Sequence, residues 1–99
     1  MRLAWSGAAK SDYLNLLSYT AAESPRNARL VQQRIDRALS LLPDFRLGRP
    51  GSRPNTFKFH IPKTSHFVVY RISSDDAVVI LAFVHTSRDW SRIAADGDA

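Results

Sequence analysis

We expect the 99 residues to form a single domain, and the lack of cysteine in them excludes a disulfide framework and any site that needs a thiolate. Lysine and arginine number 14 against 9 aspartate and glutamate, which gives a net charge of +5 and predicts an anionic partner, such as nucleic acid, the ribosome or an acidic protein segment. The longest apolar run, residues 77–84, is too short to cross a membrane, and we expect a cytoplasmic protein.

The first 43 residues predict a short strand followed by two helices. Arg2 to Trp5 has β character, and Ser6 offers an N-cap oxygen to a helix that begins at residue 7 or 8. Ser24 and Pro25 are typical of the start of a second helix, which Pro43 ends. Apolar residues recur at helical spacing on one side of each helix, so the two helices should form an antiparallel hairpin over a common core.

The remainder of the chain predicts a loop and three strands. Glycine and proline in residues 47–54 indicate irregular structure. From residue 56 apolar and polar side chains alternate, which predicts a strand with a buried face and with Lys58 and His60 projecting together from the other face. Residues 67–72 and 77–84 predict two more strands, and the second of these is apolar on both faces and therefore suits the interior of a sheet.

The resulting order is β-α-α-β-β-β. It predicts an α+β fold in which an α-helical hairpin packs on one face of an antiparallel sheet and leaves the other face as the working surface. We expect one domain over residues 1–93 and a frayed C-terminal tail over residues 94–99.

Five strings in this order resemble the ParE/RelE toxin superfamily from Leu3 to about Trp90: LAWSGAAKSDYLNLLSY, SPRNARLVQQRIDRAL, LGRPGSRPNTFKF, FVVYRI and VVILAFVHTSRDW. The resemblance implies a RelE/ParE-like fold and the toxin of a type II toxin–antitoxin system. It also implies a cognate, acidic, ParD-like antitoxin that wraps the toxin in a hetero-oligomer, and contact with operator DNA only through that antitoxin.

Two branches of the superfamily imply different targets. ParE-like toxins poison DNA gyrase, whereas RelE-like toxins are endoribonucleases that cut messenger RNA on the ribosome. The chain has Thr56-Phe57-Lys58 where ParE-like toxins have Thr-Arg-Glu, but it also has Phe67 at a basic position of the RNA cutters and no tyrosine beyond Trp90. The gyrase inhibitor is therefore the favoured reading. The ribosome-dependent messenger RNA interferase is the alternative, and a member that only binds its antitoxin on operator DNA is the third.

The candidate residues follow from the chemistry that each reading needs. RNA cleavage requires proton transfer and positive charge at the phosphate, and Lys58, His60 and Arg88 are the catalytic candidates. The candidate target-binding residues are Arg71, His85, Arg88 and Trp90, and the candidate antitoxin-binding residues are Arg29, Arg37 and Lys58. His66 is interpreted as the start of a strand. The three histidines lack ligand spacing, so neither a metal nor a cofactor is expected.

Overall fold

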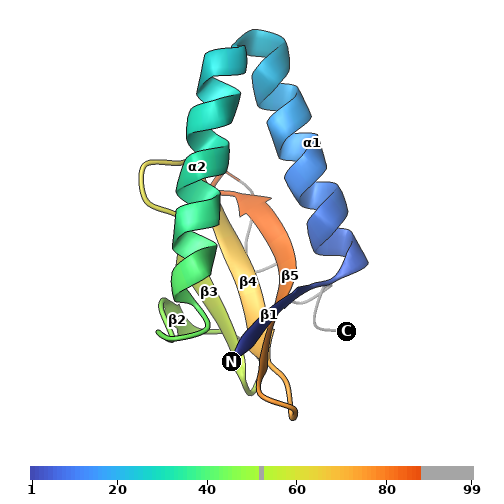
Figure 1. Cartoon of the computed structure of the whole chain (residues 1–99), viewed down its shortest axis with the longest axis vertical. Helices are drawn as coiled ribbons and strands as arrows, with labels where there is room; N and C mark the ends of the chain where they lie inside the picture. The colour runs from blue at the N-terminus through green and yellow to red at the C-terminus, as the bar shows by residue number, and fades with distance from the viewer. Residues whose placement is uncertain (52, 88–99) are drawn as a thin grey trace.

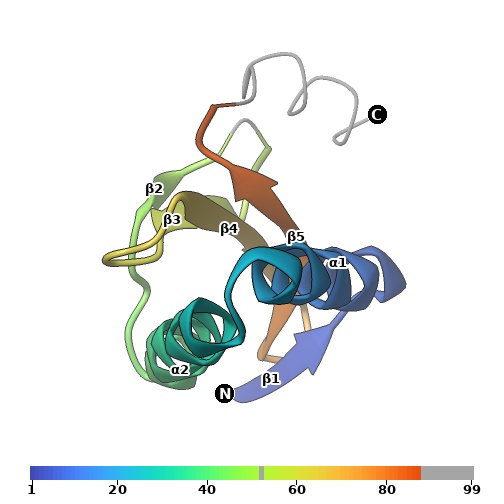
Figure 2. The ribbon, with the colours of Figure 1, turned by 90° about the horizontal axis from the view of Figure 1, so that it is seen from above.

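A computed structural model describes residues 1–51 and 53–87 of the chain, and it places two helices against one five-stranded sheet. The elements in chain order are β1 (Arg2–Trp5), α1 (Gly7–Glu23), α2 (Pro25–Leu41), β2 (Arg49–Pro50), β3 (Thr56–His60), β4 (His66–Ile72) and β5 (Ala77–His85). Figure 1 shows that the linked ends of α1 and α2 extend beyond the strands, and Figure 2 shows both helices on the same side of the sheet. The predicted two-layer α+β fold is confirmed.

The helices begin and end where the sequence predicts. The Ser6 hydroxyl accepts a hydrogen bond of 3.0 Å from the backbone N–H of Ala9 at the start of α1. Ser24 ends α1, since its N–H donates to the carbonyl of Thr20, and its hydroxyl begins α2 by accepting from the N–H of Asn27 at 3.2 Å. One serine therefore serves both helices, which makes the hairpin link short.

The two helices differ in how well they match the predicted single apolar side. In α2 the buried residues Ile35, Ala38 and Leu39 lie at helical spacing and face the sheet, as predicted. In α1 only Ala9 is fully buried, while Leu14 and Tyr19 are 63% and 73% exposed. The α1 helix thus presents large apolar side chains to solvent, whereas the sequence predicted one apolar side that faces the core.

The sheet order is β1-β5-β4-β3-β2, and its β1 edge corrects the prediction of a wholly antiparallel sheet. Strands β3, β4 and β5 pair antiparallel, but β1 pairs parallel with β5 in a register that joins Arg2 with Ala77 and Trp5 with Ile80. As predicted, β5 is an interior strand with a neighbour on both edges.

A second correction concerns residues 47–54, predicted as a loop. Arg49 and Pro50 form the short strand β2, which pairs antiparallel with Lys58 and Phe57 of β3. An edge strand tolerates proline because its missing N–H can face away from the ladder. Gly48 allows the close approach: its φ is +94°, and a Cβ atom there would lie 2.2 Å from the carbonyl oxygen of Lys58.

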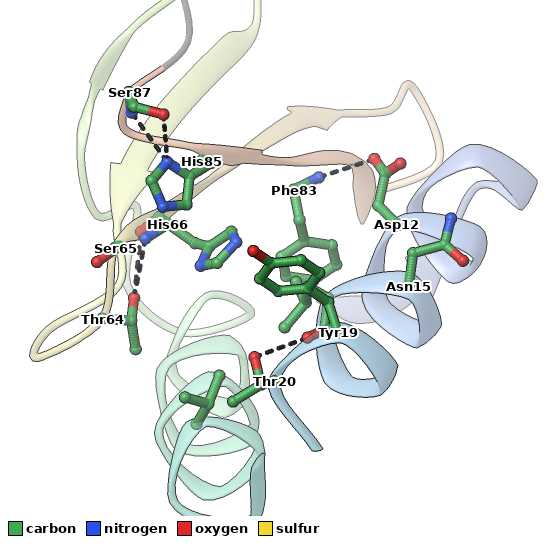
Figure 3. A pocket seen from close by; sticks show the side chains of 12 residues that line it. Asp12, Asn15, Tyr19, Thr20, Thr64, Ser65, His66, Phe83, His85 and Ser87 are labelled. Atoms are coloured by element: carbon green, nitrogen blue, oxygen red, sulfur yellow. Dashed lines mark hydrogen bonds between the residues drawn. The ribbon is translucent and has the colours of Figure 1, made fainter. Parts of the chain in front are cut away.

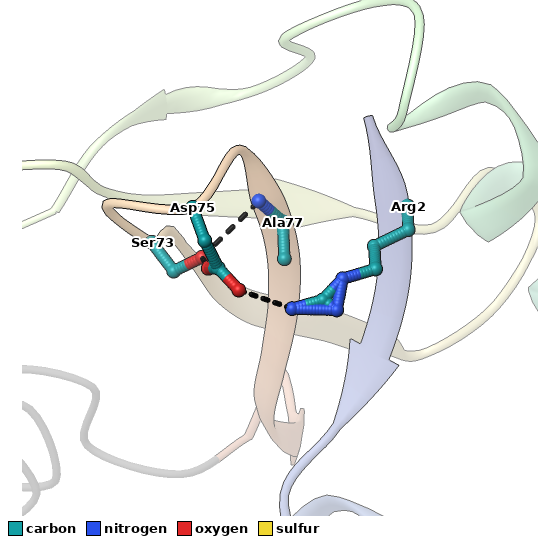
Figure 4. A network of polar contacts seen from close by, with 4 residues as sticks. All are labelled: Arg2, Ser73, Asp75 and Ala77. Atoms are coloured by element: carbon teal, nitrogen blue, oxygen red, sulfur yellow. Dashed lines mark hydrogen bonds and ion pairs between the residues drawn. The ribbon is translucent and has the colours of Figure 1, made fainter.

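The turn between β4 and β5 is held by a small polar network (Figure 4). The Ser73 hydroxyl donates to the Asp75 carboxylate and accepts from the N–H of Ala77, and Arg2 of β1 forms an ion pair with Asp75. The Ser73 hydrogen bond, followed by that from Arg2, lowers the pKa of the Asp75 carboxyl below its ordinary value. The network joins the start of β1 to the turn beside it.

None of the helices in the described ranges combines the length and the apolar content that a membrane span requires. Arg88, Trp90 and the tail over residues 94–99 lie outside the described residues, as does the end of the expected domain at residue 93.

Candidate functional site

Three of the predicted site residues project from the sheet face that the helices do not cover. Residues that pair across antiparallel strands lie on the same face, and the register joins Lys58 with Val69 and Thr56 with Arg71. His60 lies two residues beyond Lys58 and therefore shares this face. We call Arg49, Lys58, His60 and Arg71 the outer basic face, since Arg49 pairs with Lys58 at the sheet edge.

The side chains of the outer basic face differ in exposure. His60 and Arg71 are exposed, whereas Lys58 is half-buried and its Nζ lies 5.9 Å from the centroid of the Phe67 ring. This distance suits a cation–π contact, which holds the ammonium against β4 while its charge stays at the surface. The prediction that Lys58 and His60 project together, away from the helices, agrees with the register.

His85 lies on the opposite face of the sheet because of a β-bulge in β5. Tyr70 pairs with Ile80 but Val69 pairs with Ala82, so Leu81 is an extra residue without a cross-strand partner. An extra residue reverses which face the following side chains occupy. The bulge therefore turns His85 to the helix side, opposite His66, while Val84 pairs with Phe67 on the outer side.

Polar groups at the start of α1 hold the bulged strand. The N–H of Ser6 donates to the carbonyl of Ile80 at 2.9 Å, and the Ser6 hydroxyl donates to the carbonyl of Leu81 at 3.1 Å. Beyond Trp5 the strand β1 has ended, and the Asp12 carboxylate accepts from the N–H of Phe83 at 3.1 Å. These bonds satisfy backbone groups of β5 that no neighbouring strand reaches.

On the helix side, an open cleft of about 700 Å³ separates α1 from the adjoining ends of β4 and β5 (Figure 3). Its lining combines an apolar floor with polar side chains at the His66 and His85 end. The lining residues are Asp12, Asn15, Leu16, Tyr19, Thr20, Val31, Thr64, Ser65, His66, Phe83, His85 and Ser87.

The two histidines in the cleft face one another edge to face. Their ring centroids are 5.1 Å apart and the ring planes make an angle of 88°. The Nδ1 atom of His85 accepts from the backbone N–H of Ser87 at 3.1 Å, and it lies 2.6 Å from the Ser87 hydroxyl oxygen. In the neutral ring this assigns the proton of His85 to Nε2. The ring can therefore donate a hydrogen bond from the edge that faces away from Ser87.

The predicted antitoxin-binding residues do not share one surface. Arg29 and Arg37 are exposed on α2, on one side of the sheet, and Lys58 projects from the other side. A different α2 arginine, Arg34, reaches the turn between β3 and β4, where it donates to the carbonyl of Lys63 at 2.9 Å. Within the described residues no group of three or more histidine and carboxylate side chains is placed to hold a metal ion.

Comparison with known proteins identifies the family. Residues 3–90 match the model of the family described as the ParE toxin of the type II toxin–antitoxin system parDE. The chain belongs to the ParE toxin family. It is thus a toxin of a type II toxin–antitoxin system, within the ParE/RelE superfamily.

Solved structures share the fold of this ParE-family toxin. The chromosomal ParDE system of P. aeruginosa aligns with a TM-score of 0.77 at 19% identity, over 86% of this chain and 95% of that one. The isolated RelE toxin of E. coli aligns with a TM-score of 0.60 at 12% identity, over 98% and 96% of the two chains. The RelBE2 toxin–antitoxin complex of Mycobacterium tuberculosis aligns with a TM-score of 0.56 at 26% identity, over 85% and 95%. A search of curated protein sequences found no match to the chain.

Sequence reasoning about this ParE-family toxin missed the cleft and all of its polar lining residues except His85. His66 was interpreted only as a strand start, which it is, but it also lies in the cleft with Asp12 and Tyr19. A signal for the histidine pair exists, because His66 and His85 are almost equidistant from the turn at residues 73–76. That signal is incomplete, since plain alternation without the bulge places His85 on the outer face.

Proposed function

We propose that this ParE-family toxin inhibits DNA gyrase by binding it, without itself making or breaking a covalent bond, and that a cognate ParD-like antitoxin neutralises it. The observation that carries the proposal is the match of residues 3–90 to the ParE toxin family. We place the active domain in residues 1–93 and its action in the cytoplasm, where gyrase works.

The separation of the histidines by the sheet also favours binding over catalysis. His60 lies on the outer basic face, whereas His66 and His85 lie on the helix side. Strands β2, β3 and β4 contain no carboxylate, so a proton acceptor and a proton donor on the outer face would both have to come from His60 or from another part of the chain. A positively charged surface is, in contrast, sufficient for association with a macromolecule.

The target contact is best assigned to the outer basic face. Arg71 is exposed there, and it was a target-binding candidate on sequence grounds. Arg88 and Trp90 remain candidates because they follow β5 directly in the chain. His85 is removed from the target-binding set in this proposal, since it lies on the other side of the sheet from Arg71.

A supercoiling assay tests the proposal. Purified toxin should block the introduction of supercoils by gyrase, and addition of the antitoxin encoded beside the toxin gene should restore activity. Unchanged supercoiling at large molar excess of folded toxin would exclude gyrase as the target. Relaxation by a topoisomerase that does not bind the toxin serves as the control for nonspecific binding of a basic protein to DNA.

One observation favours a second candidate, the ribosome-dependent messenger RNA interferase. Lys58, His60 and Arg71 share one face, where an imidazole for proton transfer is accompanied by two cations for a phosphate. Primer extension on translated messages would then show cuts in the ribosomal A site, and both His60→Ala and Arg88→Ala would abolish them. Absence of cuts during translation arrest would exclude this reading.

The antitoxin is proposed to be acidic and to form a hetero-oligomer with the toxin. The net charge of +5 and the exposed arginines Arg29 and Arg37 of α2 support an acidic partner. Two of the similar structures are named as ParDE and RelBE2 toxin–antitoxin systems. We propose that this toxin reaches operator DNA only through its antitoxin. Complex formation should weaken as salt concentration rises, and salt-insensitive affinity would contradict the electrostatic contribution.

A simple growth experiment separates an active toxin from a member that retains only antitoxin binding on operator DNA. Expression of the toxin alone should arrest bacterial growth, and coexpression of the antitoxin should restore it. Unimpaired growth with folded toxin in the soluble fraction would support the third reading instead.

A further inference from the structure

The cleft ends in a pair of histidines that the proposed gyrase contact leaves without a role. His66 begins β4 and His85 ends β5, and the β-bulge at Leu81 places them opposite one another on the helix side. Figure 3 shows both rings at the cleft, with Ser87 on one side of His85 and His66 on the other. Two imidazoles whose ring centroids are 5.1 Å apart place their hydrogen-bonding nitrogens close together at this end of the cleft.

The charged groups around the pair favour an anion at this end of the cleft. Among the lining residues the only carboxylate is Asp12 of α1, which is already engaged by the N–H of Phe83. Tyr19 is the other titratable lining residue from α1. From the neighbouring elements, Arg34 of α2 donates to the carbonyl of Lys63, directly before the lining residue Thr64. Among the described residues that line the cleft, hydroxyl and imidazole groups therefore outnumber the one carboxylate.

The rest of the cleft suits an apolar side chain. Leu16 of α1, Val31 of α2 and Phe83 of β5 line it, and the Tyr19 ring beside them is 73% exposed. An exposed aromatic ring beside apolar side chains is typical of a binding surface, because a partner that covers it removes apolar area from water. An occupant that places an apolar side chain here brings its neighbouring residues to the histidines.

We propose that the His66–His85 pair binds a carboxylate of an acidic peptide segment seated in this cleft, and that the contact makes the association depend on pH. The inference rests on the proposed function, in which the acidic segment belongs to the antitoxin. The segment carries an apolar anchor against Leu16, Val31 and Phe83 and an aspartate or glutamate toward the histidines. Charge complementarity with a toxin of net charge +5 selects an acidic partner over a second copy of this basic chain.

The direction of the pH dependence follows from the protonation of imidazole. In the neutral ring, Nε2 of His85 donates one hydrogen bond to the carboxylate. Protonation of either histidine places a positive charge opposite the carboxylate and converts the contact into an ion pair. A carboxylate favours the protonated form of an imidazole beside it, so the bound complex takes up protons and tightens as the pH falls from about 7.5 to about 5.5.

The test is the affinity of the toxin for the antitoxin encoded beside its gene, measured by calorimetry at those two pH values and constant ionic strength. We expect binding about tenfold tighter at the lower pH, with proton uptake visible as a dependence of the heat on buffer. His85→Gln should remove most of the pH response, and His66→Gln should reduce it. His60→Gln is the matched control, because it removes a histidine from the opposite face of the sheet and should keep the response.

Neutralising the antitoxin's acidic residues one at a time identifies the carboxylate. One Asp→Asn or Glu→Gln change should abolish the pH response and should add no further loss in the His85→Gln background. If His85→Gln lowers the melting temperature markedly, His85→Asn is the second variant, and unfolding is followed in parallel.

The possible outcomes separate this inference from the proposed function. Tight binding that does not change with pH, or a response that His60→Gln removes as effectively as His85→Gln, overturns the inference and leaves the antitoxin proposal intact. No binding at either pH overturns both. Failure to inhibit gyrase overturns the proposed target alone, since the affinity measurements contain no gyrase.

Discussion

The hydroxyl of Tyr70 donates a 2.5 Å hydrogen bond to the carbonyl of Leu47, which joins the buried centre of β4 to the segment that leads from α2 to β2. Tyr70 is 0% exposed, and its ring stacks on Phe57 with centroids 5.2 Å apart. Burial raises the pKa of the Tyr70 hydroxyl, consistent with its role as a neutral donor. Tyr70 therefore connects the core of the sheet to the segment just before β2, the strand that contains Arg49 of the outer basic face.

Removal of this hydroxyl should destabilise the toxin. Tyr70→Phe keeps the ring but leaves the carbonyl of Leu47 without its donor, and we expect the free energy of unfolding to fall by about 1–2 kcal/mol. Denaturant unfolding measures the change. Tyr19→Phe is the control, because that side chain is 73% exposed and its substitution should change stability by less than about 0.5 kcal/mol. Equal effects of the two changes would contradict the assignment.

Asp12 should protect the edge of β5. Its carboxylate accepts from the N–H of Phe83, so Asp12→Ala leaves that buried donor unsatisfied and should cost about 1.5–3 kcal/mol. Amide hydrogen exchange of Phe83 should accelerate more than that of residues in β3. Asp12→Asn retains a carbonyl acceptor and should lose less than Asp12→Ala, whereas an identical loss would show that the negative charge itself is required.

Gly48 should tolerate no side chain. Gly48→Ala combines a backbone at φ +94° with a Cβ atom 2.2 Å from the carbonyl of Lys58, so the pairing of β2 with β3 must shift. We expect a loss of about 2 kcal/mol or more. Gly7→Ala is the matched comparison, since a Cβ atom there meets nothing within 4 Å, and its melting temperature should stay at or slightly above that of the unchanged protein.

Tyr13 should make stability fall at alkaline pH. Burial, followed by the hydrogen bond of 2.9 Å to Asp36, raises the pKa of Tyr13 to about 12 from the ordinary value of 10.0. The folded state thus keeps the proton after the unfolded state has lost it, so this contribution is complete below pH 10 and disappears as the pH rises toward 12. Tyrosinate absorbance should show two late-titrating groups, Tyr13 and Tyr70, and Tyr13→Phe should remove one of them. A normal titration of all tyrosines would contradict this expectation.

Arg71 should contribute to inhibition of gyrase. Reversal of its charge in Arg71→Glu places a carboxylate on the outer basic face, and the toxin concentration needed to inhibit supercoiling should rise about tenfold or more. Arg26→Glu changes the same charge on an exposed residue of α2 and should have a smaller effect. Equal losses for both variants would indicate a response to net charge and not to a defined surface.

The periodic and capping residues determine a large part of this fold by themselves. Ser6 and Ser24 hold the helix starts through hydrogen bonds to groups three residues away, and the alternation around Lys58 and His60 separates a buried face from an exposed one. These are local effects, which depend on side chains a few positions apart. The two-residue strand β2 depends instead on pairing with β3, and a loop rich in glycine and proline gives no local sign of it.

The location of His85 shows what only the tertiary structure decides. Alternation along residues 77–85 has no means to register one extra residue at Leu81, yet that residue moves His85 from the face of Lys58 to the face of His66. The bulge is held by Ser6 and Asp12, which lie about seventy residues away in the chain. The sequence by itself determined the elements other than β2 and the polarity of β3. Contacts between α1 and β5 decided which histidines meet, because strand register is set by long-range hydrogen bonds.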